Sequence, residues 1–232
     1  MDNETSSTVR IDWGRYIQAI YCLHYLPYRD RVKPCIDELA KMDIPSSRLF
    51  RFYWTYSNPF DKMIVDRMPA SYVDFHNDRV AIASNVTLAY YRIFKEAIAL
   101  GLQAIITVED DIQFSSTREE MLDVLDHLPQ NWDYIHFDKI LCKKEFHRLV
   151  DLKTDGRFIY GYVGGFWGAV FCMWSRRAME YTVNLLEKEL WPVDYFVENR
   201  DDDSLKDLHL YVPLKNLVYQ IGQEERYKSV LY

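Results

Sequence analysis

An apolar run that ends in three consecutive carboxylates constrains the fold of this chain more than any other feature. Residues 104–108 have the length and composition of a buried strand. Directly after them come Glu109, Asp110 and Asp111, whose like charges repel unless a cation binds there or one carboxyl group stays protonated. The triplet alone leaves two interpretations open: a cation site at a strand end, or an acidic loop that merely follows the strand.

The spacing within the triplet predicts which carboxylates can share a ligand. In an extended strand, residues two apart point to the same face, so Glu109 and Asp111 are expected on one face and Asp110 on the other. Oxygen ligands on one face suit a hard divalent cation such as Mg²⁺ or Mn²⁺.

Apolar periodicity predicts strands and helices in alternation. Expected strands lie at residues 16–23, 49–55, 104–108, 132–137, 158–163, 167–174, 208–212 and 216–219. Expected helices lie at residues 31–42, 87–100, 118–127 and 176–190. This order predicts an α/β sheet with right-handed crossovers.

The loop after the first expected strand carries Arg29 and leads to Arg31. Ligands of an α/β sheet bind beyond the carboxyl ends of its strands, so we expect these arginines to lie near the acidic triplet. A carboxylate-held cation that faces arginine is typical of a diphosphate site, because the cation bridges phosphate oxygens and arginine binds the remaining ones.

The charge composition of the chain bears on which ligands it can bind. A net charge of −7 argues against nucleic acid as the main ligand, because phosphate-backbone binding needs a basic surface. One basic cluster interrupts this acidity, at Lys139, Lys143, Lys144, His147 and Arg148. A solvated loop is its simpler interpretation, and contact with a lipid headgroup or a diphosphate is the alternative.

The cysteines and the N-terminal residues predict a compartment. The four cysteines form no CxxC pair, which argues against a zinc finger or a disulfide scaffold and favours a reducing compartment. Cys22 and Cys172 lie in apolar runs and are expected to be small core residues. No signal peptide or membrane-spanning stretch is evident, so we expect a soluble cytoplasmic protein, with peripheral contact at the cytoplasmic membrane face as an alternative.

Three further features carry candidate chemistry. Phe166 and Trp167, in a glycine-rich segment, can stack on a sugar ring or simply fill the core of a hairpin. Asp194 lies among apolar residues, where burial raises the pKa of a carboxyl group and suits a general base; capping a short helix is the alternative. His136 and Asp138 alternate on an expected strand and are weaker candidates for metal ligands.

Four segments, taken in order, resemble glycosyltransferase family 25, the lipopolysaccharide-biosynthesis galactosyltransferase-like family. They are residues 20–31, 93–112, 168–178 and 192–220. The resemblance implies a GT-A-like fold, in which a Rossmann-like nucleotide-binding half merges with an acceptor-binding half around one mixed sheet. Residues 1–15 would then be a polar tail and residues 16–232 a single domain, with a nucleotide-sugar half at about 16–140 and an acceptor half at about 141–232.

The resemblance also implies an activity and its residues. The family transfers a sugar from a nucleotide sugar, here expected to be a UDP-sugar, to a hydroxyl group of a glycan or lipid-linked glycan, with inversion at the anomeric carbon. Donor-binding residues would be Arg29, Arg31, Glu109, Asp110 and Asp111, and the three carboxylates would hold Mn²⁺ or Mg²⁺.

The remaining roles fall in the second half of the chain. Asp194 would be the catalytic base, and Phe166 and Trp167 would contact the acceptor. The chain departs from the family where relatives often carry Ser-His and this sequence has Ala89 and Tyr90. This departure keeps two alternatives open: a nucleotide-sugar-binding or scaffold protein without catalysis, and a metal-dependent phosphoryl-transfer enzyme.

Overall fold

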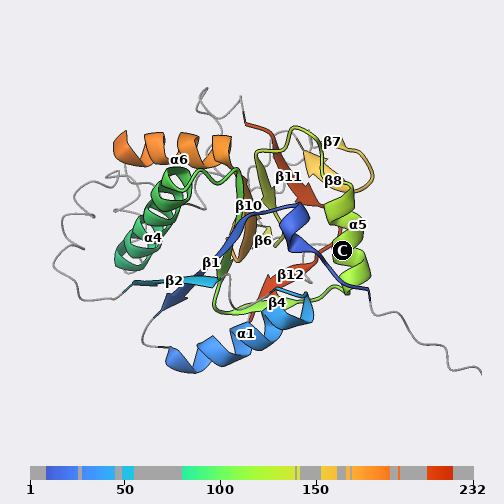
Figure 1. Ribbon diagram of the computed structural model, residues 1–232, viewed down its shortest axis with the longest axis horizontal. Coiled ribbons are helices and arrows are strands. Elements are labelled where there is room, and N and C mark those ends of the chain that lie inside the picture. The colour runs from blue at the N-terminus through green and yellow to red at the C-terminus, as the bar shows by residue number, and fades with distance from the viewer. Residues whose placement is uncertain are drawn as a thin grey trace, which may run out of the picture.

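The computed structural model describes residues 9–25, 28–44, 49–54, 80–138, 140–141, 153–160, 166–167, 169–188, 193 and 208–221. Within these residues the fold centres on an eight-stranded sheet with the strand order β2-β1-β3-β10-β5-β11-β8-β7 (Figure 1). The strands of this sheet are β1 (Ala19–Tyr25), β2 (Leu49–Trp54), β3 (Ala104–Glu109), β5 (Tyr134–His136), β7 (Lys153–Thr154), β8 (Phe158–Tyr160), β10 (Phe171–Ser175) and β11 (Leu210–Pro213).

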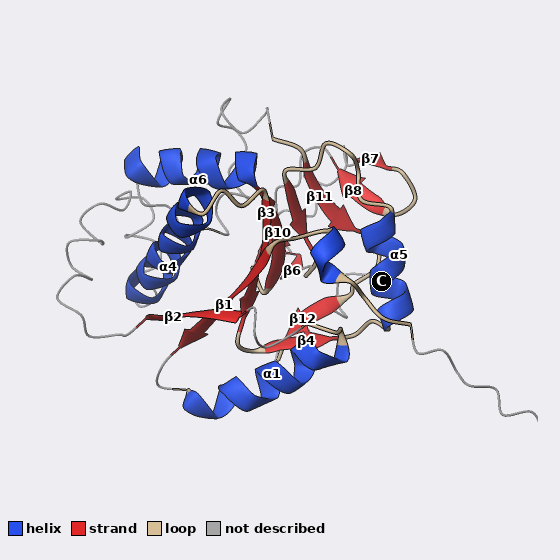
Figure 2. Ribbon diagram, viewed as in Figure 1, coloured by secondary structure: helices blue, strands red, loops and turns tan. Residues whose placement is uncertain are grey.

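Two short strand pairs and several helices complete the described fold (Figure 2). The pairs join β4 (Ile112–Phe114) to β12 (Val218–Gln220), and β6 (Ile140–Leu141) to β9 (Phe166–Trp167). The helical elements are η1 (Trp13–Arg15), η2 (Arg29–Arg31), α1 (Val32–Lys41), α4 (Val80–Ala99), α5 (Arg118–Asp126) and α6 (Arg176–Lys188).

The sheet is mixed. Strand β1 runs parallel to β2 and β3, whereas β10 lies antiparallel between β3 and β5, and β11 runs parallel to β5. The predicted α/β class is therefore confirmed, although the simple parallel alternation stops where β10 enters the sheet. Because β10 is antiparallel, its first residues lie at the same edge as the carboxyl ends of β3 and β5.

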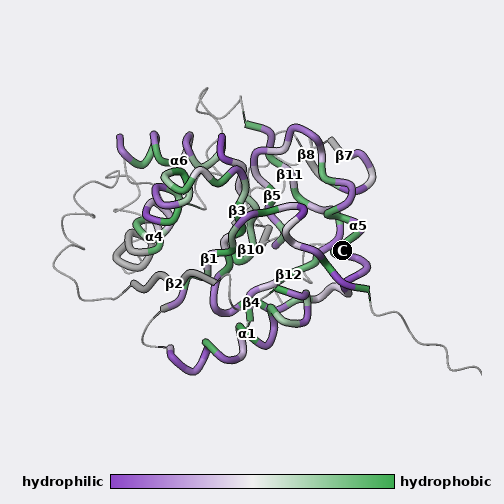
Figure 3. The backbone as a smooth tube through the Cα atoms, in the orientation of Figure 1, coloured by the Kyte–Doolittle hydropathy of each residue, from purple (hydrophilic) through white to green (hydrophobic). Residues whose placement is uncertain are grey.

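The two faces of the sheet are covered by different elements. Helices α4 and α6 pack over one face, in a core that includes Tyr90, Phe94 and Trp174. Helices α1 and α5 pack over the other, in a core that includes Leu39 and Phe171. Figure 1 shows these two pairs of helices on opposite sides of the central strands, and Figure 3 shows hydrophobic residues along β3 and β10 between them.

Local signals explain where two of the helices begin or end. Helix α5 begins with a capping box in which Thr117 and Glu120 satisfy each other's backbone N–H groups. Helix α4 ends before Gly101, whose φ of +75° is the left-handed conformation expected of a glycine after a helix.

None of the described helices is long and apolar enough to cross a membrane.

The start of the fold differs from the sequence prediction. The first strand covers Ala19–Tyr25 rather than residues 16–23, because Trp13–Arg15 forms a short 3₁₀ turn before it. Part of the expected polar tail packs against the core: Ile11 and Trp13 are buried, and Trp13 Nε1 donates a hydrogen bond to the carbonyl oxygen of Met42 at 2.6 Å. A buried indole with a satisfied N–H group is a stable core residue.

Candidate functional site

The acidic triplet lies where β3 leaves the sheet. Strand β3 ends at Glu109, and Asp110 and Asp111 form the turn that leads into β4. The prediction that Glu109 and Asp111 share one face is therefore wrong, because the extended geometry that it assumed stops at Glu109. Instead, the carboxylates of Asp110 and Asp111 both reach Arg31.

Arg31 binds the two aspartates from the end of the η2 turn. Its Nη1 atom lies 3.1 Å from Asp111 Oδ2 and 3.4 Å from Asp110 Oδ1. The guanidinium carbon lies 4.3 Å from the ring centroid of Tyr28, which is cation–π geometry. Arg29 is exposed in the same turn, and the arginine contacts described for the two aspartates come from Arg31.

Helix α1 fixes the position of this turn. Its buried Glu38 accepts a hydrogen bond from the backbone N–H of Phe114 in β4, at 2.8 Å. On the same side, Cys35 Sγ lies 3.9 Å from Cys22 Sγ in β1. The helix that follows Arg31 is thus attached to the strand before the site and to the strand after it.

His24, which the sequence analysis did not single out, orients Asp110. Its Nδ1 atom lies 2.6 Å from Asp110 Oδ2, and both side chains are buried. Leu23 and Glu109 are register partners in the parallel pair of β1 and β3. The residues that follow them, His24 and Asp110, therefore lie at the same edge of the sheet. The available signal was a histidine near the end of the first predicted strand, but only the strand pairing shows that it meets the triplet.

Asp111 is held from the far end of the chain. Gln220 Nε2 donates a hydrogen bond to Asp111 Oδ2 at 3.0 Å, and the backbone N–H of Ile221 donates to the carbonyl oxygen of Asp111 at 2.8 Å. Gln220 belongs to the fourth segment of the family resemblance, which assigned it no role. These contacts follow from the pairing of β12 with β4.

The surroundings of Asp111 favour a bound cation. Burial raises the pKa of the Asp111 carboxyl group, the hydrogen bond from Gln220 and the charge of Arg31 lower it, and the charge of Asp110 raises it again. Its Oδ1 atom is buried and has no hydrogen-bond partner among the described residues. A buried carboxylate oxygen without a partner is costly, and a divalent cation is a suitable ligand for it, so Asp110 and Asp111 fit Mg²⁺ or Mn²⁺.

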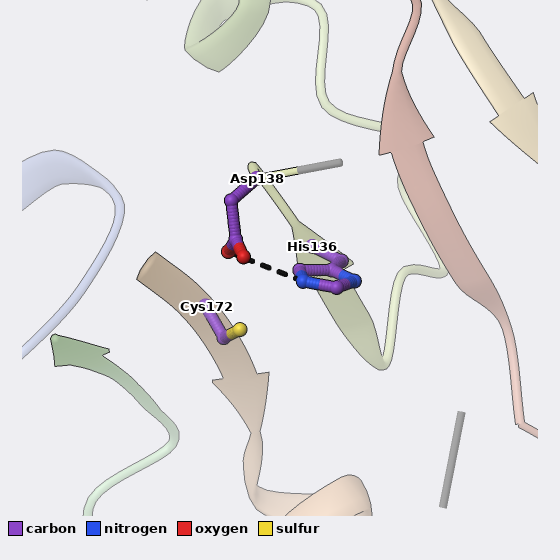
Figure 4. A group of neighbouring side chains, drawn as sticks. All are labelled: His136, Asp138 and Cys172. Atoms are coloured by element: carbon purple, nitrogen blue, oxygen red, sulfur yellow. Dashed lines mark ion pairs between the residues drawn. The ribbon is translucent and has the colours of Figure 1, made fainter. Parts of the chain in front are cut away.

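A second group of side chains lies at the same edge of the sheet, on β5 and β10 (Figure 4). His136 ends β5, Asp138 follows two residues later, and Cys172 is the register partner of His136 on β10. His136 Nε2 lies 3.1 Å from Asp138 Oδ1, and all three side chains are fully buried. The predicted burial of Cys172 is confirmed, but its proximity to His136 and Asp138 was not foreseen.

The two groups occupy opposite faces of the sheet. His24 alternates with Ile20 and Cys22, which belong to the core beneath α1. Cys172 belongs to the core beneath α4 and α6. Glu109 alternates with Ile105 and Thr107 on β3, and Ile105 belongs to this second core, so the strand places Glu109 on the same side. Its charge contributes to raising the pKa of the Cys172 thiol, after the larger effects of burial and of Asp138.

Three predicted site residues have no described side chain. Asp194 lies outside the described residues. Phe166 and Trp167 form β9, which pairs with β6, and only this backbone pairing is described. At the position of the family's Ser-His pair, Ala89 and Tyr90 are buried, and the Tyr90 hydroxyl donates to the carbonyl oxygen of Ala169 at 3.1 Å.

Comparisons with known proteins identify no relative by sequence. No protein-family profile matches the chain, and no curated protein is significantly similar to it. The resemblance to glycosyltransferase family 25 therefore stays a prediction.

Among solved structures, A197 from STIV is similar over 88% of this chain and 85% of its own, with 14% identity and a TM-score of 0.43. A glycosyltransferase involved in the glycosylation of the major capsid of PBCV-1 is similar over 73% of this chain and 66% of its own, with 10% identity and a TM-score of 0.36. The mannosyltransferase PcManGT from Pyrobaculum calidifontis, solved with GDP-Man and Mn²⁺, matches 82% of this chain at 10% identity and a TM-score of 0.39; this chain spans about half of its length, 51%. TM-scores in this range do not establish a common fold.

Proposed function

We propose that this protein is a metal-dependent, inverting glycosyltransferase that moves a sugar from a nucleotide sugar, in the first place a UDP-sugar, to a hydroxyl group of a glycan acceptor. The proposal rests on the site geometry together with the ordered sequence motifs. Membership of family 25, a GT-A-like division into donor and acceptor halves, and a lipid-linked or lipopolysaccharide acceptor are parts of the same proposal.

The buried Asp111 oxygen without a partner is the observation that carries the proposal. Two carboxylates at the carboxyl end of β3 face one arginine, and one carboxylate oxygen remains available to a cation. Cation, carboxylates and arginine together are the groups that bind a nucleoside diphosphate. An acidic loop with no ligand would leave the Asp111 oxygen buried and unsatisfied.

Each described residue then has a definite task. Asp111 would bind Mn²⁺ or Mg²⁺ directly, and His24 would hold the Asp110 carboxylate in place beside it. Arg31, which is about two-fifths exposed at 39%, can exchange part of its contact with the aspartates for a phosphate oxygen of the donor. The bound cation would supply Lewis-acid stabilisation of the diphosphate leaving group.

The acceptor side of the mechanism remains as the sequence predicts it. Asp194 would take the proton from the attacking hydroxyl group, a contribution of about 10²–10⁴-fold in rate. Phe166 and Trp167 would stack on the acceptor sugar. Both roles are proposals from the motif alone.

Titration calorimetry with UDP-, GDP- and CMP-sugars, with and without Mn²⁺, tests the donor site. We expect one nucleotide sugar to bind only in the presence of Mn²⁺ and this binding to disappear in Asp111→Asn. Asp37→Asn is the matched control, since Asp37 is an exposed residue of α1 paired with Lys33. If no nucleotide sugar binds, or if binding is unaffected by Asp111→Asn, the proposal is wrong.

Product analysis then separates the proposal from its alternatives. A glycosyltransferase releases UDP or GDP from the corresponding sugar nucleotide, or CMP from a CMP-sugar, while the sugar is transferred to an acceptor or to water. A binding protein returns the donor intact, and a phosphoryl-transfer enzyme breaks a phosphate bond and leaves a sugar phosphate. Chromatography of the nucleotide products after incubation with Mn²⁺ distinguishes the three.

A further inference from the structure

We propose that His136, Asp138 and Cys172 form a second metal site, separate from the acidic motif, which binds a zinc-like transition ion. The site does not depend on the proposed transferase activity. It joins β5 to β10 at the place where the antiparallel strand enters the sheet.

The three side chains already converge. One ligand atom from each residue lies within 4.8 Å of the others, and Figure 4 shows the imidazole, the carboxylate and the sulfur directed toward a common space. In a tetrahedral zinc site with metal–ligand distances of roughly 2.0–2.3 Å, neighbouring ligand atoms lie roughly 3.3–3.7 Å apart. The 3.1 Å between His136 Nε2 and Asp138 Oδ1 needs only a small adjustment to reach this geometry.

An unsatisfied oxygen provides an independent observation. Asp138 Oδ1 accepts a hydrogen bond from the backbone N–H of Phe171 at 3.1 Å and contacts His136. Asp138 Oδ2 is buried and has no hydrogen-bond partner among the residues that the structure describes. A buried His–Asp pair in an ordinary core would explain the first oxygen but not the second.

The donor set indicates the kind of ion. Nitrogen and sulfur ligands beside one carboxylate suit Zn²⁺ and exclude a preference for Mg²⁺ or Ca²⁺, which bind oxygen. A thiolate, a carboxylate and a neutral imidazole carry two negative charges, which a divalent ion balances. Charge balance matters here because none of the three side chains is exposed to solvent.

The cluster lies on the opposite face of the sheet from Asp110 and Asp111, whereas Glu109 of the triplet lies on the same side as Cys172. Cys172 and His136 lie beneath α4 and α6, with the Tyr134 hydroxyl 3.1 Å from Cys172 Sγ. His24 and Asp110 lie on the α1 side of the sheet. Three protein ligands leave the fourth tetrahedral position to water or another donor.

Metal analysis and cobalt spectroscopy test the proposal on the full chain. We expect the purified protein, supplied with Zn²⁺ and then dialysed, to retain one zinc ion per chain. Replacement by Co²⁺ should produce a thiolate-to-cobalt charge-transfer band and the intense visible bands of tetrahedral cobalt. Cys172→Ser should remove the charge-transfer band, whereas Asp111→Asn should leave both the zinc content and the cobalt spectrum unchanged.

If Cys172→Ser fails to fold, a variant that keeps Cys172 as its one cysteine tests the same ligand. The triple variant Cys22→Ala, Cys35→Ala, Cys142→Ala keeps Cys172 as its one cysteine, so a charge-transfer band there assigns the ligand directly. Absence of that band in the folded triple variant overturns the proposal. So does a wild-type protein without stoichiometric zinc, or zinc that is lost in Asp111→Asn and retained in His136→Gln.

Discussion

The site at Asp111 and the His136–Asp138–Cys172 cluster lie at one edge of one sheet, yet they differ in access to solvent. Arg31 keeps 39% of its side chain exposed, whereas all three members of the cluster are fully buried. An ion bound beside Arg31 can exchange and meet a substrate, while an ion bound in the cluster is enclosed. Access, rather than ligand chemistry alone, therefore separates a site suited to turnover from a site suited to holding strands together.

The largest expected effect is on catalysis. Asp111→Asn should lower turnover by about 10³-fold, since it removes cation stabilisation worth about 4 kcal/mol. The free energy of unfolding at neutral pH should not fall, because burial already disfavours the Asp111 carboxylate. Steady-state rates measure turnover, and denaturant unfolding measures stability. A large loss of stability in Asp111→Asn would contradict the proposal that Asp111 serves catalysis and not the stability of the fold.

The opposite pattern is expected at the cluster. Asp138→Asn should lower the free energy of unfolding by about 1–3 kcal/mol, because it replaces a fully buried carboxylate that accepts a hydrogen bond from the backbone N–H of Phe171 and contacts His136. Denaturant unfolding of this variant beside Asp37→Asn, an exposed control, provides the measurement. A loss of less than about 1 kcal/mol, the range of exposed ion pairs, would show that the cluster contributes little to stability.

Arg31→Lys should have a smaller effect, on donor affinity. Lysine keeps the charge but loses the planar fork that can bind a carboxylate and a phosphate together, so KM for the donor should rise about tenfold with little change in kcat. Arg29→Lys is the matched control from the same turn. Equal effects of the two substitutions would show that Arg31 has no special position.

The smallest effect concerns pH. Because burial raises the pKa of Asp111 above the ordinary value of 3.8, the native protein binds this proton more tightly than the unfolded chain does. The contribution of the protonated Asp111 carboxyl group to the free energy of unfolding is present below pH 3.8 and is lost as pH rises through the native pKa of Asp111. As pH rises from 3.8 through the native pKa of Asp111, the free energy of unfolding of the wild type should therefore fall relative to that of Asp111→Asn. Parallel pH dependences of the two proteins would contradict the raised pKa.

Local patterns in the sequence predicted much of the fold. Helix α5 and strand β3 were located to within a residue, because a capping box and a continuous apolar run are signals contained in one segment. Strand β4 was missed, since its three residues pair only with β12 at the other end of the chain. The mixed sheet implied by the family resemblance is confirmed, but the position of the antiparallel β10 between β3 and β5 was not predicted, because strand order is a property of distant pairings.

The candidate site was predictable where its members adjoin one another. The triplet itself and the nearby arginines were found, whereas His24 and Gln220 lie 86 and 109 residues away from the aspartates that they bind. His136 and Asp138 were noticed through their alternation on one strand. Cys172 could be added only once the register of β10 against β5 was known.

The contact between Asp111 and the segment around Gln220 has a consequence for how the protein is made. While the chain is being synthesised, Asp111 emerges long before residues 220 and 221, which supply its hydrogen bonds. Until then, part of the surface that β12 buries remains exposed to solvent. This surface includes the two aspartates, β4 and the face of α1 that packs on β4. The nascent chain should therefore depend on chaperones until β12 is added, and truncation before residue 218 should leave a protein that aggregates rather than a smaller folded domain.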